Sequence, residues 1–112
     1  MITIYHNPRC RKSREALKLL ETREHVEIKE YLKEPPTKEE LTHVVKLLGI
    51  KANDLLRKGE PVYREHYKGK TLSDEEWLEA MVDHPKLIER PIIIHGDKAV
   101  IGRPPENALT IL

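Results

Sequence analysis

Residues 5–14 read Tyr-His-Asn-Pro-Arg-Cys-Arg-Lys-Ser-Arg, and the expected fold is built around this segment. Residues 2–6, which lead into it, are rich in β-branched and aromatic side chains and predict a strand. Apolar side chains at helical spacing predict a helix over residues 11–22. The Asn-Pro pair between the two is a turn signal, because proline excludes helical backbone from the residue before it. Cys10 is therefore expected where a strand ends and a helix begins.

Cys10 is the only cysteine in the chain, and a helix start favours its ionised form. Unpaired backbone N–H groups and the positive end of the helix dipole would face the sulfur. Arg9, Arg11, Lys12 and Arg14 add positive charge nearby. A cysteine in such a setting is expected to be a nucleophilic thiolate near neutral pH. The alternative is a free cysteine that packs as a small hydrophobic side chain.

The composition predicts one globular, soluble domain over residues 1–112, with 38% hydrophobic and 35% charged residues. A net charge of +1 with mixed signs gives no reason to expect a nucleic-acid partner. No apolar run approaches membrane-spanning length, and no signal peptide is recognisable. A single cysteine excludes an internal disulfide, so the reducing cytosol is the expected compartment. A monomer is the expected oligomeric state.

The first half of the chain predicts a βαβ unit followed by helices. A second strand is expected over residues 26–32, where apolar and polar side chains alternate. Strand, helix and strand in so short a span make the two strands parallel. Capping-box patterns at Thr37 and Ser73 predict the starts of two helices, and residues 50–58 predict a short helix between them.

The second half predicts a β-hairpin and a closing helix. Two apolar runs, residues 92–94 and 99–101, flank the two-residue turn Gly96-Asp97. Pro105 suits the first position of a last helix, whose inward side chains are expected to be Ala108, Leu109 and Leu112. The order predicts an α/β, thioredoxin-like fold with a mixed four-stranded sheet and a helical insert between its βαβ and ββα halves.

Short motifs follow one another at residues 4–10, 31–37, 54–57, 84–85, 89–93 and 102–106. Their order and spacing resemble the glutaredoxin-linked arsenate reductase family of the ArsC type, and in particular its YfgD-like subgroup. The resemblance runs over residues 2–112, which is essentially the whole chain.

The resemblance implies an oxidoreductase in which Cys10 attacks arsenate and an adduct forms. Glutathione is then the co-substrate that reduces the arsenic, and glutaredoxin resolves the mixed disulfide left on Cys10. Arg57, Arg90 and Arg103 match the arginines that surround the oxyanion in the family. The residue type suits this task, because a guanidinium presents a planar fork that pairs with two oxygens.

Further residues gain expected roles from the resemblance. His6 matches a histidine near the cysteine and would favour the thiolate if protonated, although a surface histidine at a strand end is the other interpretation. Ser13 could hydrogen-bond the thiolate or be a plain polar residue of the first helical turn. Pro91 falls where thioredoxin-like folds have a cis-proline. Arg11 and Lys12 replace the Gly-Thr of the well-studied members, which makes Arg11 a further candidate ligand of the oxyanion.

No metal and no bound cofactor are expected, because the remaining histidines show no ligand-like spacing with each other or with Cys10. Two other functions stay open. One is a thiol reductase of the same fold that acts on another substrate, such as a glutathione mixed disulfide. The other is a redox-linked transcription regulator, against which Ser13 counts because a Cys-x-x-Cys switch needs cysteine at that position.

Overall fold

The computed structural model describes residues 2–23 and 25–112, and the chain divides into two compact units. Unit 1 comprises residues 1–34 and 90–112, and unit 2 comprises residues 35–89. In the described residues, no helix is both long enough and apolar enough to cross a membrane. The expectation of a single domain over the whole chain stays a prediction.

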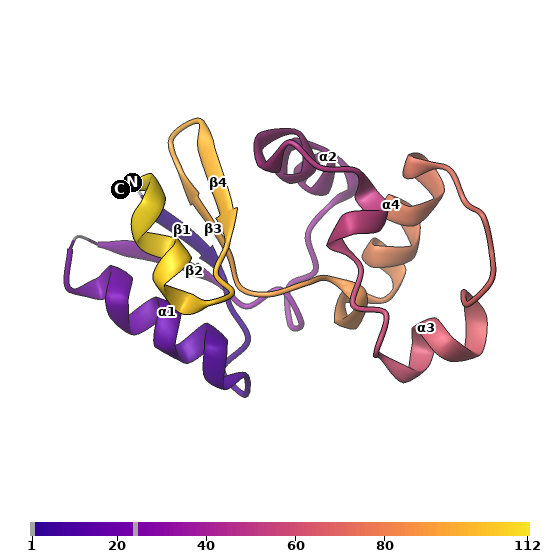
Figure 1. Ribbon diagram of the computed structural model, residues 1–112, viewed down its shortest axis with the longest axis horizontal. Helices are drawn as coiled ribbons and strands as arrows, with labels where there is room; N and C mark the ends of the chain where they lie inside the picture. The colour runs from indigo at the N-terminus through magenta and orange to yellow at the C-terminus, as the bar shows by residue number, and fades with distance from the viewer. Residues whose placement is uncertain (1, 24) are drawn as a thin grey trace. The chain divides into compact units, whose positions relative to one another are not determined.

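Unit 1 is built on a mixed four-stranded sheet with the strand order β2-β1-β3-β4 (Figure 1). β1 (Ile2–Tyr5) pairs in parallel with β2 (Val26–Lys29) and antiparallel with β3 (Ile92–His95). β3 pairs antiparallel with β4 (Lys98–Ile101) through a tight hairpin, in which Gly96 has φ of 63°. The predicted α/β fold with its mixed sheet is confirmed.

The core of unit 1 lies between one face of the sheet and two helical segments. α1 (Arg11–Glu21) and the 3₁₀ helix η3 (Pro105–Ile111) pack against each other on this face (Figure 1). Burying each large aliphatic side chain there stabilises the fold by about 2 kcal/mol. The buried members of this core are Ile2, Ile4, Ala16, Leu20, Val26, Ile93, Ala108 and Ile111.

The last helix, η3, has fewer residues per turn than the α-helix that was predicted. It is a 3₁₀ helix, in which side chains three residues apart share a face. Pro105, Ala108 and Ile111 are accordingly the buried set. Ala108 was expected to face inward, but Leu112 was wrongly placed there, since 39% of its surface is exposed.

The second strand is shorter than predicted, because β2 ends at Lys29 rather than continuing to residue 32. Its pairing with β1 stops at Tyr5, and His6 N–H then donates to the Lys29 carbonyl at 2.8 Å. After that bond β1 has no further residues with which the second strand could pair. The chain therefore turns, and the Lys33 N–H donates to the Glu30 carbonyl at 3.0 Å. Alternation of side chains does not indicate where a partner strand ends.

Unit 2 is helical, and α4 is its central element. α4 packs against α2, η1 and η2. Its elements are α2 (Lys38–Leu48), η1 (Ala52–Leu55), α3 (Pro61–His66), α4 (Asp74–Asp83) and η2 (Pro85–Leu87). The short helix expected over residues 50–58 is reduced to η1, because Leu56 turns extended and forms a β-bridge with Ile88.

Both predicted capping boxes are confirmed. The Thr37 hydroxyl accepts a hydrogen bond from the Glu40 N–H at 3.1 Å, and the Glu40 carboxylate accepts one from the Thr37 N–H at 3.0 Å. Ser73 and Glu76 make the same reciprocal pair at the start of α4. These bonds satisfy backbone donors that the helix cannot satisfy itself.

Replacing Thr37 with alanine removes the hydroxyl acceptor while leaving the rest of the helix start unchanged. We expect Thr37→Ala to lower the free energy of unfolding by about 1 kcal/mol in urea titrations. Thr37→Ser keeps the acceptor and should stay near the parent protein. Equal losses in the two variants would contradict a stabilising cap at this position.

Candidate active site

Cys10 occupies the N-cap position of α1, at the end of a short turn that follows β1. Its backbone is extended, with φ −92° and ψ 121°, and its carbonyl accepts the first helical hydrogen bond from the Arg14 N–H at 3.0 Å. The turn is held by Asn7, whose carbonyl accepts from the Cys10 N–H and whose side-chain oxygen accepts from the Arg9 N–H. The predicted change from strand to helix at Cys10 is confirmed.

The start of α1 is suited to an anion. The cap is made without a side-chain hydrogen bond, and the first turn contains no acidic residue. Because the first N–H groups of a helix have no partner within the helix, they give this end a partial positive charge. Cys10 is 8% exposed, so little water surrounds its side chain at this end of the helix.

Arg103 is the charged side chain that reaches the sulfur. Its Nη2 atom lies 3.6 Å from Cys10 Sγ, and its Nε donates to the Arg90 carbonyl at 2.7 Å. The second bond holds the guanidinium with its Nη2 atom beside the sulfur. A guanidinium held in this way stabilises a thiolate and can also pair with oxygens of a bound oxyanion.

Gly102 allows the chain to bring Arg103 to this position. A Cβ atom at Gly102 would lie 2.8 Å from Pro91 Cγ and 2.9 Å from Ile93 Cδ1, which is closer than carbon atoms can pack. The Gly102 N–H donates to the Pro91 carbonyl at 2.9 Å, which holds the two segments together. Any other residue after β4 would have to displace Pro91 or Ile93, so glycine is the residue that lets the chain reach Arg103 without such a shift.

His6 and Ser13 form a buried pair behind the turn. Ser13 is fully buried and His6 is 6% exposed, so the interpretation of His6 as a surface residue is wrong. His6 Nδ1 lies 2.6 Å from Ser13 Oγ, which also accepts from the Asn7 N–H at 3.0 Å. The serine hydroxyl thus ties the turn to α1, and its partners in the described part of the chain are His6 and Asn7, where the sequence also allowed a bond to the Cys10 thiolate.

Burial lowers the pKa of His6, because the charged ring loses its hydration, and the nearby positive charge of Arg14 lowers it further. Glu30 and Glu21 act in the opposite direction without overcoming these effects. The ring is therefore mainly neutral at pH 7, so it does not supply the positive charge that a protonated His6 would place near the thiolate. In the tautomer with its proton on Nε2, Nδ1 accepts the hydrogen of the Ser13 hydroxyl.

The other predicted site residues lie in different settings. Arg11 is exposed and its Nε pairs with Glu15 at 3.0 Å, so its guanidinium is turned to solvent rather than to the sulfur. Arg90 is half-buried and contributes its carbonyl to Arg103. Pro91 is buried, and the Arg90–Pro91 peptide bond is cis, as the resemblance implied; the Arg103–Pro104 bond is also cis.

Arg57 belongs to unit 2, where two carboxylates engage its side chain. Its Nη1 lies 2.9 Å from Glu60 Oε1, and its Nε lies 3.7 Å from Glu89 Oε1. Its backbone N–H donates to the Leu87 carbonyl at 2.7 Å, which fixes the start of the side chain. Among the described residues, no group of three or more histidine, cysteine, aspartate or glutamate side chains could hold a metal ion.

Sequence reasoning missed two members of the site, Asn7 and Gly102. Asn7 was read only as part of a turn signal, although an asparagine side chain that caps its own turn is a known use of this residue type. Gly102 lies directly between β4 and the Arg-Pro pair, and a glycine at the end of a buried strand can indicate close backbone approach.

Fold and site together define a thioredoxin-like protein with one cysteine at the start of its first helix. The model of the ArsC family matches residues 5–111, and the chain belongs to this family. YfgD of Escherichia coli is 46% identical over 99% of this chain and 96% of its own length.

Relatives with a named activity are equally similar. A protein of Haemophilus influenzae named arsenate reductase is 45% identical over 99% of this chain and 98% of its own length. The solved structure named arsenate reductase from Vibrio cholerae has a TM-score of 0.95 and 44% identity, and covers 99% of this chain and 97% of that one.

The lowered pKa of His6 predicts a pH dependence of stability. Below pH 6.5 the unfolded chain takes up a proton that the buried ring resists, so the free energy of unfolding should fall as the pH falls. His6→Gln should flatten this fall in urea titrations, whereas His66→Gln, at an exposed histidine, should leave it unchanged. The same slope in His6→Gln and the parent protein would contradict the assignment.

A methyl group at Gly102 should separate Arg103 from the sulfur. We expect Gly102→Ala to slow the alkylation of Cys10 by iodoacetamide at neutral pH by about tenfold, because the Arg103 guanidinium would no longer lie beside the sulfur. Gly59→Ala is the matched control, since a Cβ at Gly59 meets nothing within 4 Å.

A double-mutant comparison separates positioning from a general loss of structure. In the Arg103→Ala background, Gly102→Ala should change the alkylation rate little further, because the effect passes through the arginine. Additive losses in that background would show that Gly102 acts by another route.

Proposed function

We propose that this protein is an arsenate reductase in which the Cys10 thiolate is the nucleophile. The observation that carries the proposal is the position of Cys10 Sγ at the start of α1, 3.6 Å from the Arg103 guanidinium. The names of the H. influenzae and V. cholerae relatives, each similar over almost the whole chain, support arsenate as the substrate.

In the first step the Cys10 thiolate attacks the pentavalent arsenic. A sulfur–arsenic bond forms and an arsenic–oxygen bond breaks, and the departing hydroxide takes a proton and leaves as water. The guanidinium of Arg103 and the N–H groups at the start of α1 would stabilise the negative charge on the oxygens in this step. A serine hydroxyl in place of the thiol is too weakly acidic to make this attack.

In the second step an external thiol reduces the arsenic. Glutathione sulfur bonds to Cys10 sulfur, and the electron pair of the sulfur–arsenic bond stays on the arsenic, which becomes trivalent and leaves as arsenite. Two thiols are oxidised to one mixed disulfide, and the electrons balance. Because Cys10 is the only cysteine, a second protein thiol such as that of glutaredoxin has to release it. The reducing cytosol supplies such thiols.

The arginines divide into two groups in this proposal. Arg103 and Arg90 lie in the same unit as Cys10, and Arg103 is oriented by the Arg90 carbonyl. Arg57 would have to exchange at least one of its carboxylate partners, Glu60 or Glu89, for an oxyanion. A guanidinium has donors enough for two partners, so Arg57 can keep one carboxylate and still offer N–H groups to the substrate.

A second candidate function is the reduction of glutathione mixed disulfides. The engagement of Arg57 by two carboxylates favours it, because a disulfide substrate places no oxyanion among the arginines. In this reaction the Cys10 thiolate attacks the mixed disulfide, displaces the other thiolate, and is later released by glutathione.

The decisive assay measures arsenate reduction by the purified protein with glutathione and glutaredoxin, beside Cys10→Ser. We expect turnover in the parent protein and none in Cys10→Ser. Arg103→Ala should lower kcat/KM about a hundredfold, and Arg57→Lys should also lower it, because the planar fork is lost while the charge stays.

The same preparation is assayed on a glutathione mixed disulfide. Activity on the mixed disulfide alone would refute arsenate as the substrate and support the second candidate. Turnover of neither substrate, with Cys10 still rapidly alkylated, would refute both.

A further inference from the structure

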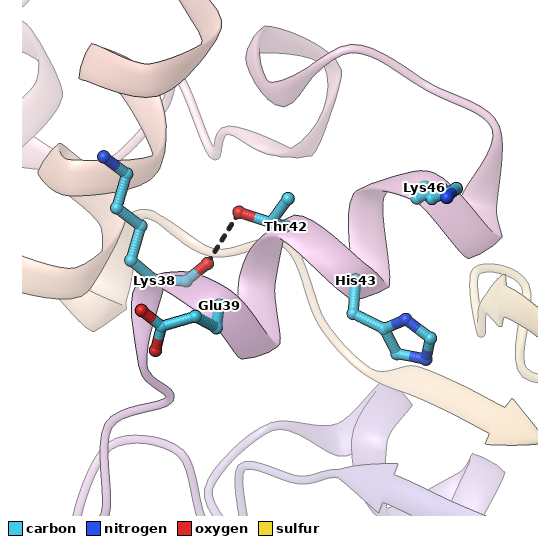
Figure 2. Close-up of a pocket in the computed structure, with 5 residues that line it drawn as sticks. All are labelled: Lys38, Glu39, Thr42, His43 and Lys46. Atoms are coloured by element: carbon cyan, nitrogen blue, oxygen red, sulfur yellow. Dashed lines mark hydrogen bonds between the residues drawn. The ribbon is translucent and has the colours of Figure 1, made fainter.

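Unit 2 contains two surface pockets, which differ in how far their polar side chains are paired with other residues. The first lies along α2 and is lined by residues of that one helix, as Figure 2 shows. Two of its five lining residues are already engaged: Lys38 Nζ lies 3.1 Å from both Glu75 and Glu79, and the Thr42 hydroxyl donates to the Lys38 carbonyl at 2.8 Å. The other three are exposed residues of the same helix, so they do not enclose a ligand.

The second pocket is a cavity of about 360 Å³, which we call the lysine cavity. Its wall comes from five successive segments of unit 2: the region of η1, the turn after it, α3, the loop that leads into α4, and α4 itself. Small-molecule sites commonly have volumes of about 300 to 1,000 Å³, so the cavity can hold an organic molecule as well as a simple ion. The residues that line it are Lys51, Asn53, Lys58, Tyr63, Lys70, Thr71, Leu72, Asp74 and Trp77.

The charges around the lysine cavity favour an anion. Three ammonium groups, those of Lys51, Lys58 and Lys70, line it together with one carboxylate, that of Asp74. Elsewhere in unit 2 Lys38 pairs with two carboxylates, whereas none of these three lysines has a carboxylate within 4 Å in the described part of the chain.

The residue types favour phosphate over carboxylate. Lysine is a compact point charge that binds phosphate without the paired geometry that an arginine fork imposes. The Asn53 amide and the Thr71 hydroxyl add neutral hydrogen-bond donors to the same wall. Three separate cations suit a ligand with more than one phosphate group.

An aromatic wall lies beside these cations. Tyr63 is half-buried and stacks on Trp77, with ring centroids 6.2 Å apart and an interplanar angle of 26°. Trp77 is a core residue, since it is only 4% exposed. The remaining surface of Tyr63 offers a flat apolar contact of the kind on which nucleobases stack. Asp74 can accept hydrogen bonds from ribose hydroxyls, which accounts for one carboxylate in a basic site.

We propose that the lysine cavity binds a nucleotide that carries two or more phosphate groups. The phosphates lie among Lys51, Lys58 and Lys70, and the base packs against Tyr63. All the residues involved belong to unit 2, and the binding is separate from the chemistry proposed for Cys10.

The test uses the full chain and its single tryptophan, because Trp77 lines the cavity and its fluorescence reports on it. We expect ATP to change this fluorescence saturably, and Lys58→Ala and Lys70→Ala to weaken the affinity by about tenfold each. Lys46→Ala removes an exposed lysine outside the cavity and is the matched control. Tyr63→Leu should weaken ATP binding but leave tripolyphosphate binding unchanged.

Several outcomes would overturn the proposal. They are the absence of a saturable change, the same affinity in Lys58→Ala as in Lys46→Ala, and binding of adenosine as tightly as ATP. Tripolyphosphate that binds as tightly as ATP would remove the base from the site and overturn the nucleotide assignment. An acidic peptide or a single-stranded RNA that binds more tightly than ATP would assign the cavity to a macromolecule. None of these binding measurements requires arsenate turnover, so their results do not depend on the proposed function.

Discussion

The approach of the Arg103 guanidinium to the Cys10 sulfur, at 3.6 Å, joins two parts of the chain that are 93 residues apart. It depends on two further contacts. The Arg90 carbonyl accepts from Arg103 Nε and holds the guanidinium beside the sulfur, and Gly102 packs directly against Pro91 because it has no side chain. Arg103 thereby places a positive charge next to a sulfur that is itself nearly buried.

The order of strands explains why these segments meet. β1 is central and pairs with β2 on one side and β3 on the other. Tyr5, the last residue of β1, is opposite Ile92, the first residue of β3, and Ile92 is in turn opposite Ile101 at the end of β4. The turn before α1, the Arg90–Pro91 segment and the Gly102–Arg103 segment therefore leave the sheet at the same end. The segments that surround the sulfur therefore all adjoin the same end of one small sheet.

The positively charged side chains of unit 2 fall into two groups, which differ in how many carboxylates lie close to them. Arg57 and Lys38 are each held by two carboxylates, which fixes their side chains and offsets their charge. The lysines of the cavity line a hollow that holds a single carboxylate. The same residue types therefore stabilise the fold in one place and favour an anion in another. Their total charge in the sequence does not distinguish these uses, because it contains no information on which groups lie within 4 Å of each other.

Features whose causes lie within a few residues could be predicted from the amino-acid sequence. They include the capping boxes at Thr37 and Ser73, the hairpin turn at Gly96 and the strand-to-helix change at Cys10. Tertiary structure alone decided the burial and lowered pKa of His6, the end of β2 and the role of Gly102. Capping and turn formation are bonds between near neighbours, which local sequence specifies. Burial, the length of a strand pairing and close packing depend on groups from distant parts of the chain, and only the folded structure brings those together.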